Sequence, residues 1–285
     1  MSEHAETKPG ASPEPGSAAG PLLLWGDVGF DDYATGETLL GGCALNVARA
    51  ALAARPDFAV QVAAPLGEDG QPLRAELARL GAEVSLLETH PGRTPRQPIQ
   101  LASDGERTLS GYEAGVLGEV RQPSDALRAA LSEAGLVYVP VFAQTLGWAR
   151  AAWESGAPVA LDLMDLDEIP EGFLPEAAER SCLLFAGLST THPRLAELRE
   201  LARGGTATWI VTLGAEGAWA WSGGEEVSIP AAPVPGGRVV DTTGCGDTFA
   251  GTFLVRWRAG AGLRAALEAA SQAAARVAGK LGTYE

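Results

Sequence analysis

Short apolar runs alternate with helical patterns along most of this 285-residue chain. Residues 21–25, Pro-Leu-Leu-Leu-Trp, are typical of a strand that is buried on both faces of a parallel sheet. A second strand is expected at 59–64, followed by a helix through Leu73 and Leu77 and a third strand at 84–87. Four later strands are expected at residues 136–142, 158–163, 182–185 and 209–213. This alternation predicts an α/β fold with a mostly parallel sheet.

The segment 94–112 breaks the alternation. Residues 99–101 alternate between apolar and polar side chains, and Asp104-Gly105 has the chemistry of a hairpin turn. A β-hairpin inserted into an α/β protein indicates a lid or a dimer surface. Because an exposed strand edge can pair with another chain, a homodimer through the lid is one expectation.

The expected domain plan is one folded unit. Residues 1–20 are rich in proline, glycine and small polar residues without periodicity, which predicts a disordered leader. We expect a single domain over 21–285, into which lid segments at about 31–40 and 92–113 are inserted.

The charge balance excludes some partners. The chain has 21 Lys and Arg against 36 Asp and Glu, a net charge of −15. This balance argues against a nucleic acid or an acidic membrane as partner, because phosphates would be repelled. Cys43, Cys182 and Cys245 have no CxxC spacing, which makes a disulfide framework or a structural zinc site improbable. Without a signal peptide or a long apolar run, the expected location is the cytoplasm.

Residues 240–257 combine a glycine turn, a helix start and an acid. Asp241 and two threonines precede Gly244-Cys245-Gly246, and Asp247 then opens a helical pattern. Glycines let the backbone approach a ligand closely, and the unpaired amides of a first helical turn favour an anion. A carboxylate beside an anion site indicates that a proton is removed there. The alternative for Asp247 is an ordinary helix N-cap.

Other segments carry candidate binding residues. Asp31 and Asp32 follow the first strand, and ligands bind beyond the carboxyl ends of strands in open α/β sheets. Gly41-Gly42 opens an alanine-rich helix that contains Asn46, whose amide could bond a sugar hydroxyl or cap the helix. For Asp32 a solvated turn is the favoured interpretation.

These motifs together resemble the ribokinase/PfkB family of carbohydrate kinases. Asp-Thr-Thr-Gly-Cys-Gly-Asp at 241–247 is similar to the family's C-terminal signature, with Cys245 where alanine is usual. Gly41-Gly42 with Asn46 matches the N-terminal signature, and the resemblance covers about residues 22–282. It implies a ribokinase-like three-layer α/β/α sandwich with a mostly parallel central sheet and a small β-sheet lid.

The resemblance also implies roles for matching residues. Asp247 would be the general base, and the amides of Gly244, Cys245 and Gly246 would form an anion hole for the transferred phosphoryl group. The remaining implied contacts are Thr212, Gly214, Gly217 and Thr243 with the nucleotide, Asp31, Gly42 and Asn46 with sugar hydroxyls, and Asp241 and Thr243 with a monovalent cation such as K⁺. The implied cofactors are ATP and Mg²⁺.

Two positions depart from the family pattern. The usual Asn-x-x-Glu motif, which organises water around magnesium, is replaced at 188–193 by Leu-Ser-Thr-Thr-His-Pro. Asp162 fits an acidic position of the family, but residues 163–165 lack the asparagine that usually lies nearby. How the chain handles magnesium is therefore open at this stage.

The lid segment resembles the fructoselysine 6-kinase branch of the family, through residues 104–107 and 111–116. This implies a ketose or fructosamine-type sugar that is phosphorylated on a primary hydroxyl. Arg107 could contact a substrate carboxylate or phosphate, or form a salt bridge in the lid. The alternatives are a kinase for a simpler sugar (ribose, fructose or a nucleoside) and a catalytically impaired sugar- or nucleotide-binding protein.

Overall fold

A nine-stranded sheet with the order β13-β12-β11-β10-β9-β8-β1-β4-β5 forms the centre of the computed structural model. The structure describes residues 20–109, 111–119 and 122–283. Its strands are β1 (Leu22–Trp25), β4 (Val60–Leu66), β5 (Leu87–Thr89), β8 (Leu136–Pro140), β9 (Val159–Asp162), β10 (Leu183–Gly187), β11 (Thr208–Thr212), β12 (Ala218–Ser222) and β13 (Glu225–Ile229). The strands from β11 to β5 pair in parallel, and β12 and β13 add an antiparallel edge.

The central strands of the sheet are buried on both faces because they are largely apolar, whereas the edge strands β5 and β13 carry exposed polar residues. Side chains of neighbouring residues in a strand point to opposite faces. In β1, Leu22 and Leu24 accordingly join one hydrophobic core, while Leu23 and Trp25 join the other. All four are 3% exposed or less, which matches the continuous apolar run in the sequence.

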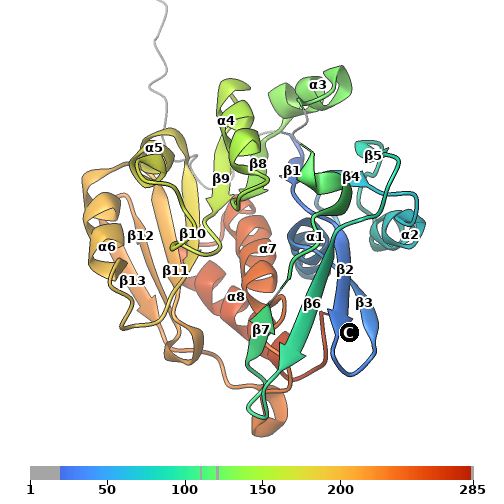
Figure 1. Cartoon of the computed structure of the whole chain (residues 1–285). Helices are drawn as coiled ribbons and strands as arrows, with labels where there is room; N and C mark the ends of the chain where they lie inside the picture. The colour runs from blue at the N-terminus through green and yellow to red at the C-terminus, as the bar shows by residue number, and fades with distance from the viewer. Residues whose placement is uncertain (1–19, 110, 120–121, 284–285) are drawn as a thin grey trace, which may run out of the picture.

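Helices cover both faces and complete three layers (Figure 1). One face carries α1 (Cys43–Ala54), α2 (Gln71–Leu80), α7 (Cys245–Arg258) and α8 (Leu263–Ala278). The other carries α3 (Asp125–Glu133), α4 (Leu146–Glu154), α5 (Phe173–Arg180) and α6 (Leu195–Gly204). Short 3₁₀ turns lie at η1 (Gly115–Gly118), η2 (Gly214–Glu216) and η3 (Pro235–Gly237).

A second, four-stranded sheet has the order β3-β2-β6-β7. Its strands are β2 (Gly29–Tyr33), β3 (Thr38–Gly41), β6 (Arg96–Leu101) and β7 (Arg107–Leu109). They lie together in the lower part of Figure 1, β2 and β3 in blue and β6 and β7 in green. The hairpin predicted at Asp104-Gly105 joins β6 to β7, with Gly105 at φ 85°. The expected three-layer fold with a small β-sheet lid is thus confirmed.

Some local expectations differ from the structure. The strand expected at 84–87 lies at Leu87–Thr89 instead, because residues 84–87 form a turn in which Leu87 N–H donates to the Val84 carbonyl at 3.1 Å. The sequence patterns did not predict α3 and α5, which have only nine and eight residues. The leader expected at 1–20 lies outside the described residues except for Gly20. Among the described residues, no helix is long and apolar enough to cross a membrane.

The chain order in the sheet defines one switch point. β1 pairs with β4 on one side and, far later in the sequence, with β8 on the other. In open α/β sheets, ligands bind beyond the carboxyl ends of the strands at such a reversal. The loop after β1 and the end of β9 both lie at this edge, where the small sheet also begins.

Candidate active site

Asp247 lies in the first turn of α7, after Gly244, whose φ of 70° is left-handed. Its Oδ2 accepts a hydrogen bond from Asn46 Nδ2 at 3.0 Å. Burial raises the pKa of Asp247 to about 6, although the hydrogen bond from Asn46 and the charge of Arg107 oppose the rise. The carboxyl is therefore mostly ionised near neutral pH, and its pKa is close to the range in which a carboxylate works as a base.

The backbone around Gly244 forms a tight turn. Cys245 N–H donates to the Thr242 carbonyl at 3.2 Å, so this amide is engaged within the loop. The Cys245 thiol contacts the Ala274 carbonyl at 3.7 Å, and burial raises its pKa to about 12. A thiol that stays protonated is a poor nucleophile, which agrees with a spacer role for this side chain.

Asp241 is fully buried and fully hydrogen-bonded. It accepts from Tyr33 Oη at 2.6 Å and from the backbone N–H groups of Thr243 and Gly282, each at 2.8 Å. Burial alone would raise the pKa of Asp241, but these hydrogen bonds hold it below its usual range. The carboxylate joins the lid strand β2, the loop before α7 and the segment after α8. The adjacent Thr243 Oγ1 is buried and has no hydrogen-bond partner of regular geometry among the described residues, although the Thr243 side chain is near enough to Asp241 to help lower the pKa of that carboxyl.

Asp31 lies on the lid strand β2 and is 7% exposed. Its carboxyl lies against Gly41, where a Cβ would overlap the carboxyl oxygens. Burial raises the pKa of Asp31 to about 7, and the negative charges of Asp27 and Asp247 add to the rise, whereas Arg107 opposes it. No hydrogen bond within the described part of the chain satisfies this carboxyl, which leaves it able to contact a ligand.

Asp27 and Asp162 complete a group that we call the acidic cluster: Asp27, Asp31, Asp162 and Asp247. Asp27 follows β1, is 7% exposed and accepts from Cys43 N–H at 3.0 Å. Asp162 ends β9 and accepts from Tyr138 Oη and from Met164 N–H, each at 3.1 Å. Burial raises the pKa of Asp162 to about 6, and the charge of Asp247 contributes. Four carboxyls therefore converge at the switch point.

Tyr112 lies in the 111–116 segment that carries the lid resemblance, but no role was predicted for its side chain. Its Oη is buried and has no hydrogen-bond partner among the residues that the structure describes, and its ring packs edge-on against Phe142 with centroids 6.1 Å apart. Burial raises its pKa, and the charges of Asp27, Cys43 and Asp31 contribute, which places the phenol beside the acidic cluster. A buried phenol without a partner is costly unless a ligand satisfies it. No spacing pattern marks this residue in the sequence.

Arg107 lies on β7 of the lid. Its Nη1 donates to the Thr242 carbonyl at 2.9 Å, and Thr242 N–H donates to the Gly105 carbonyl at 3.2 Å. The lid hairpin therefore lies directly against the loop before α7. Asp32, by contrast, pairs with Arg96 at 2.7 Å away from the acidic cluster.

Three of the four predicted nucleotide residues lie at the carboxyl end of β11, and the fourth, Thr243, lies in the loop before α7. Thr212 ends the strand, and Gly214 and Gly217 form a turn with φ of 58° and 98°. A Cβ at Gly217 would overlap the Ile229 carbonyl, so only glycine fits there. The neighbouring loop at 188–193 begins with Leu188 N–H donating to the Thr212 carbonyl at 2.9 Å. Backbone groups, more than side chains, shape this side of the site.

The side chains do not form a ready metal cage. Within residues 20–109, 111–119 and 122–283, no group of three or more His, Cys, Asp or Glu side chains is placed to hold a metal ion. Mg²⁺ usually binds through one or two carboxylates together with substrate phosphates and water. The residues present thus fit an ion that arrives with the nucleotide better than a resident one.

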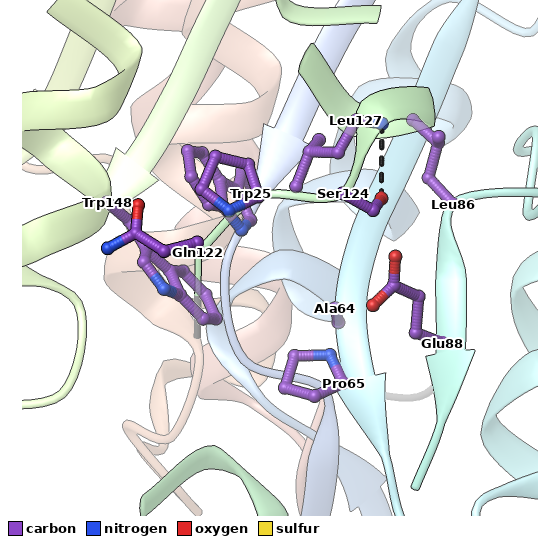
Figure 2. Close-up of a pocket in the computed structure, with 10 residues that line it drawn as sticks. Trp25, Ala64, Pro65, Leu86, Glu88, Gln122, Ser124, Leu127 and Trp148 are labelled. Carbon is purple, nitrogen blue, oxygen red and sulfur yellow. Dashed lines mark hydrogen bonds between the residues drawn. The ribbon is translucent and has the colours of Figure 1, made fainter. Parts of the chain in front are cut away.

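A separate pocket lies on the other face of the sheet, between β4 and the helices α3 and α4 (Figure 2). Trp25 and Trp148 stack there with ring centroids 5.0 Å apart. The lining residues are Trp25, Ala64, Pro65, Leu86, Glu88, Gln122, Pro123, Ser124, Leu127 and Trp148. None of them belongs to the acidic cluster, so this pocket is distinct from the site described above.

The fold and the site together define a ribokinase-like class of protein. Residues 32–285 match the pfkB family of carbohydrate kinases, and the chain therefore belongs to that family. It is an ATP-dependent carbohydrate kinase.

Individual relatives differ in substrate. The fructoselysine 6-kinase of Shigella flexneri is 28% identical over 218 residues, which cover 74% of this chain and 79% of that protein. The structure of Arabidopsis thaliana ribokinase complexed with ribose and ATP has a TM-score of 0.73 at 23% identity, covering 93% of this chain and 94% of that one. The structure of Burkholderia thailandensis nucleoside kinase in complex with inosine has a TM-score of 0.76 at 20% identity, covering 92% of each chain.

Proposed function

We propose that this kinase transfers the γ-phosphoryl group of ATP to a primary hydroxyl of a ketose or fructosamine-type sugar, with Asp247 as general base. The observation that carries the proposal is the position of Asp247. It lies at the start of α7, oriented by Asn46 and covered by the lid from which Arg107 contacts the same loop. A base beside an N-terminal helical turn can serve a nucleophilic hydroxyl and an anion at once.

The chemistry needs one proton transfer. As the sugar oxygen bonds to the γ-phosphorus, the bond from that phosphorus to the β–γ bridging oxygen breaks, and ADP leaves with the electron pair. The hydroxyl proton passes to the Asp247 carboxylate. Because phosphoryl transfer depends mainly on positioning and electrostatic stabilisation, one carboxylate in hydrogen-bond reach of the hydroxyl suffices.

The developing phosphoryl charge would be held by backbone amides of residues 244–246. Gly244, with its left-handed φ, is the N-cap of α7, and the helix starts at Cys245. The amides of this turn therefore lie at the N-terminal end of the helix. The Cys245 amide donates to Thr242, so an arriving phosphoryl group would compete for it or rely on Gly244 and Gly246. Such preset donors stabilise charge without reorganisation during the reaction.

The nucleotide would bind at the glycine turn after β11. We assign its contacts to Thr212, Gly214 and Gly217, with Thr243 near the phosphates. Backbone turns of this kind accept a flat base and its ribose without a charged side chain. Mg²⁺ supplies charge neutralisation on the ATP phosphates when bound, and we treat it as part of the Mg-ATP substrate.

The sugar would bind beneath the lid. Asp31 and the Gly42 backbone would contact its hydroxyls, with Asn46 and Arg107 at the edge. The free carboxyl of Asp31 and the surrounding acidic cluster favour a ligand that carries positive charge. The protonated secondary amine of a fructosamine meets this condition, and a neutral hexose does not. This observation, together with the similarity to fructoselysine 6-kinase, supports the fructosamine assignment.

A second candidate is a kinase for a simpler sugar, such as ribose, fructose or a nucleoside. Hydroxyl groups could also satisfy Asp31 and Tyr112, since both lack partners among the described residues. Charge on the substrate therefore separates the two candidates.

Asp241 and Thr243 would support a monovalent cation behind the anion loop. The buried Thr243 Oγ1, without a hydrogen-bond partner of regular geometry among the described residues and beside a buried carboxylate, supports this assignment. Exchange of potassium for sodium should lower turnover, and indifference to the exchange would remove the site.

We also propose a cytoplasmic enzyme that forms a homodimer through the lid. Leu109 on β7, the edge of the small sheet, is 48% exposed and would be covered in such a dimer. Sedimentation of the wild type and of Leu109→Lys tests this directly, because the charged variant should be monomeric.

The decisive experiment is a substrate panel with Mg-ATP. It should contain fructoselysine, other fructosamines, fructose, ribose and nucleosides, with ADP formation as the readout. Preference for fructosamines at pH values where the amine is charged supports the first candidate. Turnover of neutral sugars alone supports the second. A sugar that binds tightly but is never phosphorylated would indicate a catalytically impaired binding protein.

A further inference from the structure

The segment after α8 returns to the candidate active site. Gly282 N–H donates to Asp241 Oδ2 at 2.8 Å, and Thr283 Oγ1 donates to Asn46 Oδ1 at 2.9 Å. Thr283 is 6% exposed. This segment therefore contacts both the loop before α7 and the helix α1 that carries Asn46.

Asn46 uses both ends of its amide. Its Nδ2 donates to Asp247 Oδ2, while its Oδ1 accepts from Thr283 and, at 3.3 Å, from Arg49 Nη1. An amide has its donors on nitrogen and its acceptors on oxygen. Donors on the Oδ1 side therefore decide which end faces Asp247. With the amide rotated by half a turn, Oδ1 would face the carboxylate and repel it.

Arg49 sets the direction of this hydrogen-bond chain. It donates to Thr283 Oγ1 and lies 3.5 Å from Glu76, with side chains 9% and 10% exposed. A guanidinium has no acceptor, so the Thr283 hydroxyl must accept from Arg49 and give its own proton to Asn46. The donors thus run from Arg49 through Thr283 and Asn46 to Asp247, and chains of this kind polarise one another.

Thr283 also supports the loop that precedes α7. A Cβ at Gly244 would overlap the Thr283 Cγ2, which shows that the methyl group packs directly on this glycine. The same residue thereby contacts the anion loop through its methyl group and the base through its hydroxyl and Asn46.

We propose that Thr283 is a positioning residue for phosphoryl transfer: its hydroxyl fixes the orientation of the Asn46 amide, and Asn46 in turn holds Asp247 as an ionised, aimed base. The proposal rests on the proposed role of Asp247. Thr283 lies near the end of the described residues, outside all of the sequence motifs.

The expected signature is a change in the pH dependence of turnover. The groups that face Asp247 come from seven parts of the fold: Asn46 and Cys43 from α1, Asp27 from the loop after β1, Asp31 from β2, Tyr138 from β8, Asp162 from β9, Arg107 from β7 and Cys245 from α7. Asn46 stabilises the ionised carboxyl, so a misoriented amide raises the pKa of Asp247. The base works ionised, and the acidic limb of the kcat profile therefore moves to higher pH.

The test compares Thr283→Val with Thr283→Ser. Valine keeps the shape but loses the hydroxyl, and we expect kcat to fall about tenfold with an acidic limb about half a pH unit higher. Serine keeps the donor and should recover the wild-type pH profile, although the methyl contact with Gly244 is lost. The KM for ATP should stay within about twofold in both. Ser132→Ala on α3, an exposed hydroxyl that bonds only its own helix, is the matched control.

A merely structural role gives a different result. If Thr283→Val lowers Tm but leaves the pH profile unchanged, or if Thr283→Ser behaves like the valine variant, the proposal is wrong. Thermal unfolding of all variants separates loss of fold from loss of positioning. Asp247→Asn is measured alongside: its full activity would refute the proposed base, whereas its inactivity with an unchanged Thr283→Val profile refutes only the positioning role.

Discussion

The two halves of the site are built from different parts of the chain. Beneath the lid, polar side chains converge: the buried Asp27, Asp31, Asp162 and Asn46, and the half-buried Asp247 and Tyr112. At β11, the backbone turn of Gly214 and Gly217 supplies the shape, and the nearby loop at 188–193 is largely exposed. In the first half, carboxyls of like charge lie close enough to raise one another's pKa values. In the proposed nucleotide half, the backbone supplies the shape without such repulsion.

The largest expected effect falls on the base. Asp247→Asn keeps the size and the contact with Asn46 but cannot take a proton, so kcat should fall about 10³-fold, within the range of general-base catalysis. Sugar binding measured by calorimetry should stay within a few fold, because the amide can still contact a hydroxyl. Turnover close to wild type would place the base elsewhere in the acidic cluster.

Matched glycine substitutions compare the two halves directly. Gly244→Ala and Gly214→Ala both put a side chain at a left-handed φ, which costs about 1–2 kcal/mol. At Gly244 the new Cβ also overlaps Thr283, whereas at Gly214 nothing lies within 4 Å. We therefore expect Gly244→Ala to lose far more stability and nearly all turnover.

Chemical unfolding and steady-state kinetics of both variants measure this difference. Equal losses of stability would show that the loop before α7 relaxes freely. In that case the close contact between Gly244 and the segment after α8 would not affect stability or turnover.

A pH series tests the strain in the acidic half. Asp31 has a folded pKa of about 7, above its unfolded value, so ionisation opposes folding as pH rises from about 4 to 7 and the penalty is complete above 7. At about 1.4 kcal/mol per pKa unit, the upper limit is about 4 kcal/mol. Asp31→Asn should therefore raise Tm at pH 8 more than at pH 4, while sugar binding weakens.

The control for this series is Asp32→Asn on the same strand. Asp32 pairs with Arg96 and Thr38, and its pKa is lowered, so its loss should reduce stability at pH 8. A gain of stability at pH 8 in Asp31→Asn and a loss in Asp32→Asn would support the environments assigned to the two aspartates. Changes of stability in the same direction would contradict them.

The smallest expected effect concerns the hydroxyl groups of Tyr112 and Tyr138. Tyr112→Phe removes a hydroxyl without a partner, so Tm should hold or rise while sugar affinity falls about tenfold. Tyr138→Phe removes a hydroxyl bonded to Asp162 and should cost about 1 kcal/mol of stability. Unchanged sugar affinity in Tyr112→Phe would exclude the phenol from the binding site.

The fold could be predicted from the sequence because its signals are local, and the motif that marks Asp247, the proposed base, is local as well. Apolar runs and their spacing predicted the parallel sheet, and seven consecutive residues place Asp247 after a glycine turn. The proposed sugar side was only partly predictable. The contact of Asn46 with a sugar hydroxyl stays a prediction, whereas its hydrogen bonds with Asp247, Thr283 and Arg49 are not foreseeable from any local pattern.

Tyr112 and Thr283 could not be predicted, because a single residue that belongs to no repeated spacing pattern gives no signal in the sequence. Tyr112 becomes notable only when its hydroxyl is found buried without a partner. Thr283 is one threonine in a glycine-containing turn, and its contact with Asn46 spans 237 positions. Asp27 had a usable signal, since it directly follows the first strand at the carboxyl edge of the sheet.

The hydrogen bond from Tyr33 to Asp241 has a consequence for how the enzyme is made. It joins positions 208 residues apart, and the Asn46–Asp247 bond joins positions 201 apart. Contacts of such long sequence separation form late in folding. A nascent chain can complete the early strands of the sheet but cannot assemble the proposed sugar site before residue 247 has been synthesised. Assembly of the proposed sugar site therefore depends on pairing early and late segments of the chain, through the Tyr33–Asp241 and Asn46–Asp247 contacts.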